Sequence, residues 1–229
     1  MEQSKQTRGA CAYCGRELTR SGMGRHLGAC EKRKEVIEAA DRNSAEAMPL
    51  LHIQVQPAWG GAHWLHLEVN GSATLKQIDS YLRAIWLECC GHLSQFSFGG
   101  WGEQKLGMTR KASQVFQPGA ELTHIYDFGT ESVTLLKALT VRQGKPTTKH
   151  PIALMARNEA PSFTCQECGS PATRFCVECA YEDDEEKPGT LCEEHAEDHP
   201  HEDYGEPMAL VNSPRAGMCG YEGPADPPY

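Results

Sequence analysis

The sequence has no apolar run that approaches the roughly 18 residues needed to cross a bilayer. Its first ten residues, MEQSKQTRGA, lack the apolar stretch of a secretion signal, so we expect neither a membrane-spanning nor a secreted protein. The eleven cysteines are an odd number, which fits a framework of paired disulfides poorly. We therefore expect a cytoplasmic protein whose thiols stay reduced.

The spacings typical of common catalytic centres are also missing. No Ser-His-Asp arrangement, glycine-rich phosphate loop or carboxylate pair stands out, so we do not expect an enzyme. The 229 residues are 39% hydrophobic, which is enough for a core and argues against a wholly disordered chain.

Basic residues are scarce in the last third of the chain. Residues 159–229 hold 17 acidic and 3 basic side chains, whereas residues 1–46 and 47–158 each have a small basic excess. Most cysteines also lie near the two ends, with only Cys89 and Cys90 between them. These shifts predict separate modules. We expect units at 8–46, 48–158 and 160–223, and a flexible tail at 224–229.

A cysteine–histidine pattern marks the first unit. It consists of Cys11-x2-Cys14, with Gly15 directly after it, and His26-x3-Cys30. A Cys-x2-Cys turn brings two thiols together, and residues four apart share one face of a helix. The spacing predicts one zinc site, and it resembles a single Cys-Cys-His-Cys zinc finger of the ββα kind.

Basic side chains are frequent around this finger. Residues 1–34 hold 8 basic and 3 acidic side chains, which could contact a phosphate backbone. The candidates for nucleic-acid contact are Arg16, Arg20, Arg25, Lys32, Arg33 and Lys34. Alternatively, these are solvated charges paired with nearby glutamates, and the finger binds protein or is purely structural.

The second unit mixes strand and helix patterns. Alternating apolar residues predict strands at 50–57 and 64–71, and further strands are expected at 95–100, 122–127 and 131–141. Thr74 and Gln77 form a capping-box signature for an amphipathic helix of about 17 residues that ends at Gly91. The order β-β-α-β-β-β predicts an α+β roll, flanked by two small zinc-binding modules.

The cysteines and histidines of this unit show no ligand spacing. Cys89 lies on the apolar stripe of the expected helix, where a free cysteine behaves as a small hydrophobic residue. We expect the histidines to be surface residues or hydrogen-bonded core residues. They are His52, His63, His66, His92 and His124.

The segments YLRAIWLECCGHLSQFSFGG and LTHIYDFGTESVTLLKALTV carry a further signal. Across roughly 50–145 the chain resembles the plasmid pRiA ORF-three-like family, through Tyr126, Asp127, Phe128 and Gly129. The resemblance implies an α+β roll of mobile-element or prokaryotic origin, without an established activity. We expect Asp127 and Gly129 to make a turn and Phe128 to cover the end of the core.

The third unit has the densest set of potential ligands in the chain. Two Cys-x2-Cys pairs are followed by a Cys-x2-His pair and two more histidines, which makes eight donors for two tetrahedral zinc ions. The donors are Cys165, Cys168, Cys176, Cys179, Cys192, His195, His199 and His201, with Cys219 as a ninth candidate. These potential ligands equal or outnumber the coordination positions of two zinc ions, and this favours closed, structural sites.

The order of these donors resembles a cross-braced B-box domain. That resemblance implies that Cys165 and Cys168 join Cys192 and His195 at one ion, while Cys176 and Cys179 join the later histidines at the other. The sequence leaves open which of His199, His201 and Cys219 completes the second site. With the finger, about three zinc ions are expected from twelve ligands.

Together, these patterns favour a zinc-binding, non-enzymatic adaptor with a protein partner, and a basic partner suits the acidic third unit. The main alternative is a DNA-binding accessory or regulatory factor of a mobile element, which would bind through residues 1–34. An enzyme with a cleft in the roll is a weaker alternative. The sequence predicts no contact with membranes.

Overall fold

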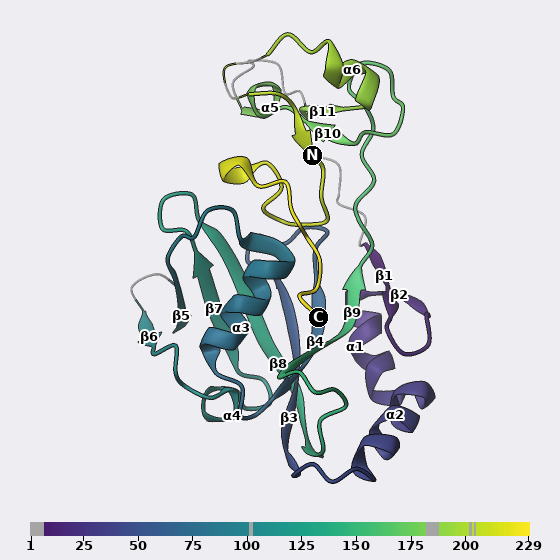
Figure 1. Ribbon diagram of the computed structural model, residues 1–229, viewed down its shortest axis with the longest axis vertical. Helices are drawn as coiled ribbons and strands as arrows, with labels where there is room; N and C mark the ends of the chain where they lie inside the picture. The colour runs from purple at the N-terminus through teal and green to yellow at the C-terminus, as the bar shows by residue number, and fades with distance from the viewer. Residues whose placement is uncertain (1–6, 101–102, 182–187, 202, 204) are drawn as a thin grey trace.

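The computed structural model describes residues 7–100, 103–181, 188–201, 203 and 205–229 (Figure 1). The first strands and helices are β1 (Arg8–Cys11), β2 (Glu17–Thr19), α1 (Arg20–Ala29), α2 (Glu31–Asp41), β3 (Met48–Pro57), β4 (Leu65–Asn70) and α3 (Leu75–Leu82). They are followed by a π-helical turn (Arg83–Leu87), β5 (Ser94–Phe98), β6 (Gln104–Leu106), α4 (Ala112–Val115), β7 (Glu121–Tyr126), β8 (Ser132–Gly144) and β9 (Ile152–Asn158). Within these ranges, nine strands form one antiparallel sheet in the order β2-β1-β9-β4-β3-β8-β7-β5-β6. The predicted α+β class is confirmed.

The main helix begins where the sequence predicts and ends earlier. The hydroxyl of Thr74 accepts the backbone N–H of Gln77, and the side chain of Gln77 accepts the N–H of Thr74, so the capping box is present. The α-helix passes into the π-helical turn, and Glu88 takes an extended conformation. The helical path therefore ends at Leu87, and Cys89 lies in the loop beyond it rather than on the helix.

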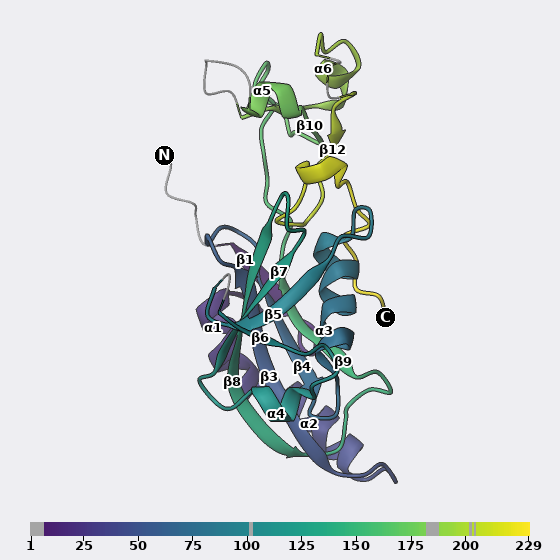
Figure 2. The ribbon, with the colours of Figure 1, turned by 90° about the vertical axis from the view of Figure 1, so that its left-hand side faces the viewer.

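Both faces of the central sheet are covered, by α3 on one side and by α1 on the other (Figure 2). The apolar side chains of β3 and β4 pack with α3, as the alternation predicts. The polar residues of the same strands face α1 and α2, so His66 and Glu68 are buried rather than exposed. On that side, His52 Nε2 and His66 Nδ1 lie 2.8 Å apart, and His66 Nε2 lies 3.1 Å from the carbonyl of Arg20.

The N-terminal strands are part of the central sheet. β1 pairs with β9 in an antiparallel register that places Gly9 opposite Asn158. A Cβ on Gly9 would lie 2.0 Å from the carbonyl oxygen of Arg157, so this close approach requires glycine. Met23 and Leu27 of α1 are buried against Trp64 of the roll. The expected first unit thus shares both a sheet and a core with the second.

A buried ion-pair cluster also joins the finger to the roll. Glu68 on β4 is 3% exposed and pairs with Arg33 of α2 and Arg142 of β8, each at 2.9 Å. Arg33 also donates to the carbonyl of Leu27 at 2.9 Å. One carboxylate is therefore held by two guanidinium groups from different parts of the chain, and this offsets its desolvation.

The C-terminal part forms a small separate sheet. Its elements are β10 (Arg174–Phe175), α5 (Val177–Tyr181), β11 (Thr190–Leu191), α6 (Glu193–Glu197), β12 (Met208–Ala209) and a 3-10 turn (Met218–Gly220). In the described part of this region the strand order is β11-β10-β12. The acidic run at 182–186 lies outside the described residues. We call residues 163–209 the zinc module and residues 211–221 the return segment.

The return segment runs from the zinc module back to the roll (Figure 1). Asn212 exchanges hydrogen bonds with Asn158 at the end of β9, and Ser213 donates to the carbonyl of Trp86 at 2.6 Å. At the chain's end, where we expected a mobile tail, the ring of Tyr229 stacks on His150 with centroids 3.9 Å apart. The last third of the chain is thus divided between the zinc module and the surface of the roll.

No helix in the described part of the chain is both long and apolar enough to cross a membrane.

Candidate metal centres

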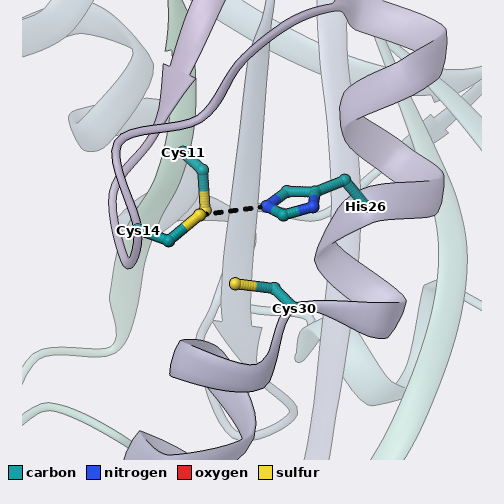
Figure 3. A group of neighbouring side chains, drawn as sticks. All are labelled: Cys11, Cys14, His26 and Cys30. Carbon is teal, nitrogen blue, oxygen red and sulfur yellow. Dashed lines mark hydrogen bonds between the residues drawn. The ribbon is translucent and has the colours of Figure 1, made fainter.

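The four ligands predicted in the finger meet at one point (Figure 3). Cys11 is the last residue of β1, Cys14 lies in the turn that follows, and His26 projects from α1. Cys30 lies in the break between α1 and α2, with an extended backbone that points its thiol toward the others. Their ligand atoms all lie within 4.8 Å of one another, and Cys14 Sγ is 3.3 Å from His26 Nε2.

The turn around this pair recurs in the zinc module. Gly15 donates its N–H to the carbonyl of Cys11 at 2.8 Å, and Gly169 donates to that of Cys165 at the same distance. Both glycines have positive φ, +72° and +74°, which a residue with a Cβ adopts at a cost. The sequence Cys-x2-Cys-Gly therefore forms the same knuckle at both ends of the chain.

The zinc module brings together two interleaved sets of four ligands. One set is Cys165, Cys168, Cys192 and His195, and the other is Cys176, Cys179, His199 and His201. In the first, Cys168 Sγ and Cys192 Sγ are 3.8 Å apart. In the second, Cys179 Sγ lies 3.3 Å from His199 Nε2 and 3.4 Å from His201 Nδ1. This is the pairing that the resemblance to a cross-brace implies, and both later histidines lie in the second set.

Cys219 lies elsewhere, in a fourth group that the sequence did not reveal. Its thiol meets Cys89, Cys90 and His92, which come from the loop between the π-helical turn and β5. Our interpretation of Cys89 as only a small hydrophobic residue is therefore incomplete, although its side chain also packs against the core. All eleven cysteines of the sequence now belong to one of four clusters.

The chemistry of the clusters fits zinc. Thiols and imidazoles are its preferred ligands, and tetrahedral Zn–S bonds of about 2.3 Å would place ligand sulfurs about 3.8 Å apart. Burial is the main reason that the pKa of Cys11 is raised to about 11, so its thiolate needs a nearby cation. Burial also opposes ionisation of Cys165, but backbone N–H groups, first that of Cys192, outweigh it and lower its pKa to about 6.

The six basic candidates for nucleic-acid contact differ in their surroundings. Arg33 pairs with the buried Glu68, so its guanidinium is committed to the fold. Lys32 pairs with Glu35, and Lys34 with Glu31, both on the exposed face of α2. Arg20 is half-buried, and Arg16 and Arg25 are the two exposed arginines among the six candidates.

The Tyr126–Gly129 segment is held by the return segment. Asp127 has a positive φ of 64°, and its carboxylate accepts the N–H of Gly129 and pairs at 2.6 Å with Arg215. Arg215 is fully buried and also donates to the carbonyl of Thr130. Asp127, not Gly129, therefore takes the left-handed conformation of this turn. Phe128 is 40% exposed and lies outside the buried core, and its role at the end of the core stays a prediction.

An apolar groove of about 380 Å³ lies where the loop between β3 and β4 meets the zinc module and the return segment. Trp59, 87% exposed, and Phe163, 43% exposed, are part of its lining. A smaller hollow that Trp59 also lines includes Glu131.

No family model and no curated protein matches this chain. Among solved structures it is similar to a protein of unknown function, MM3350, from Methanosarcina mazei Go1. The sequence identity is 16% over 45% of this chain, and the TM-score is 0.38. This chain covers 66% of that protein, just under two thirds of its length. Similarity at this level assigns neither a family nor a function.

Proposed function

We propose that the chain is a zinc-stabilised, non-enzymatic adaptor that binds a basic segment of a partner protein. The observation that carries the proposal is that every cysteine lies in a cluster with four protein ligands. Four protein ligands fill a tetrahedral zinc ion and leave no position for water or substrate, as is typical of structural sites. The metal would then support a binding surface rather than a reaction.

The groove around Trp59 is the proposed docking surface. A large, exposed indole beside an apolar groove is typical of the anchor residues that dominate protein interfaces. The charge of the last third of the chain supports a basic occupant, because residues 159–229 hold 17 acidic and 3 basic side chains. Glu131 adds a carboxylate to a hollow that Trp59 also lines. The occupant is a peptide segment with an apolar residue flanked by lysine or arginine.

Selection from a random peptide library displayed on phage tests this proposal. We expect the enriched peptides to carry an aromatic or aliphatic residue flanked by basic ones. Trp59→Ala should weaken their binding about 30-fold or more, or about 2 kcal/mol, as measured by calorimetry. Leu93→Ala removes another exposed apolar side chain outside the groove and should leave the affinity unchanged. Enrichment of acidic peptides, no enrichment, or equal binding by Trp59→Ala would contradict the proposal.

A DNA-binding accessory factor of a mobile element is the second candidate. The exposed Arg16 and Arg25 favour this candidate. Its mobile-element origin rests on the resemblance at Tyr126–Gly129. The adaptor proposal predicts only weak binding of a 20-base-pair duplex, unaltered by the double change Arg16→Ala and Arg25→Ala. Tight binding that falls steeply with salt and is lost in the double variant would replace the adaptor with a DNA-binding protein.

A further inference from the structure

Four potential ligands outside the finger and the zinc module meet where the roll contacts the return segment. Cys89, Cys90 and His92 belong to the roll, and Cys219 follows Cys90 by 129 positions in the sequence. Their ligand atoms all lie within 4.8 Å of one another. Two distant parts of the chain thus converge on one point with thiol and imidazole groups.

The distances within this group match a tetrahedral zinc site. The sulfur of Cys90 lies 3.7 Å from that of Cys89 and 3.9 Å from that of Cys219, against about 3.8 Å for two thiolates on one zinc ion. His92 Nε2 lies 3.0 Å from Cys90 Sγ and 3.4 Å from Cys219 Sγ. Three sulfurs and one imidazole are also the donor set of the finger.

The surroundings compensate the charge that such a site would carry. A zinc ion with three thiolates has a net negative charge, and the guanidinium of Arg215 lies 3.5 Å from Cys89 Sγ. Tyr126 Oη lies 3.6 Å from the same sulfur. The backbone is bent toward this point, because Gly91 has a φ of +84° and Cys219 one of +52°. A left-handed cysteine is uncommon and is consistent with a thiol that is held in place.

We propose that these four residues bind a structural zinc ion that fastens the return segment to the roll. The ion closes a loop of more than a hundred residues that contains the whole zinc module. It thereby fixes that module, and its side of the Trp59 groove, relative to the roll. None of the four ligand residues is buried, whereas each of the other clusters contains at least one buried cysteine. This zinc ion therefore exchanges with chelators more readily than the others.

Native mass spectrometry of the full chain tests the proposal. We expect four zinc ions in the wild type and three in Cys219→Ser, with unchanged circular dichroism. Cys219→His should keep the fourth ion. Histidine can bind zinc, and it tolerates the left-handed backbone conformation of this position. In Cys219→Ser, trypsin should cleave after Arg215 at least tenfold faster, because this buried residue becomes accessible.

Equal zinc counts in the wild type and Cys219→Ser would overturn the proposal. If Cys219→Ser misfolds, the zinc count of Cys90→Ser gives the same test, because Cys90 is an exposed ligand on the roll. There too, loss of a single ion supports the proposal and an unchanged count overturns it. The adaptor function is tested separately, because the peptide-binding result with Trp59→Ala does not depend on this count.

Discussion

Replacing Cys165 with serine is expected to release two zinc ions and to unfold the zinc module. The reason is the interleaving, since Cys165 and Cys192 belong to one site and the ligands Cys176 and Cys179 of the other lie between them in sequence. Among the described residues of this module, the buried apolar cluster consists of three ligand cysteines and Leu191. Structural zinc in such small units contributes about 10–16 kcal/mol, which so small a core cannot replace.

Zinc counting by native mass spectrometry and backbone amide spectra measure this effect. Cys14→Ser is the matched control, because it removes one ligand from a site that is not interleaved in sequence with another, and should release one ion. In Cys165→Ser we expect amide signals of the zinc module to collapse to unfolded positions while those of the roll persist. Release of a single ion with a folded module would show that the two sites are independent.

Asp127→Asn is expected to destabilise the roll by about 3–5 kcal/mol. The change removes the carboxylate that pairs with the buried guanidinium of Arg215 at 2.6 Å, and breaking a buried ion pair by removing one partner is costly. Arg215 also lies with its guanidinium carbon 5.0 Å from the ring centroid of Tyr126, so it cannot reach water without disturbing the core. Urea unfolding followed by the fluorescence of the buried Trp64 and Trp86 measures the loss.

The double variant Asp127→Asn with Arg215→Met is the control for this prediction. Because the charge is then removed along with its partner, it should be more stable than Asp127→Asn alone. A loss below about 1 kcal/mol in Asp127→Asn would show that the pair contributes little. The return segment would then be held mainly by its other contacts, such as those of Asn212 and Ser213.

Local spacing made twelve of the clustered residues predictable. Cys11-x2-Cys14 and the pairs of the zinc module are close in sequence, and a Cys-x2-Cys-Gly turn needs no tertiary contact to bring its thiols together. The fourth cluster was not predictable, because Cys219 joins Cys90 only through the folded path of the whole chain. The apolar pattern also predicts a helix through Cys89, whereas the helical path ends at Leu87.

The central sheet was also only partly predictable from local sequence patterns. The alternation in β3 and β4 revealed two strands, but it did not reveal that His66 and Glu68 are buried, because a sequence does not show what covers the second face. β9 was missed for a related reason. Both of its neighbours, β1 and β4, are distant in sequence, and its residues, IALMARN, show no clean alternation. The finger joins the sheet of the roll through this strand, because β9 pairs with β1.

Anomalous diffraction from crystals of the full chain at the zinc absorption edge tests the central claim most directly. The account predicts one strong peak at the centre of each cluster, within about 2.3 Å of the sulfurs and about 2.1 Å of the imidazole nitrogens. An anomalous map without peaks at the finger and the zinc module would contradict it.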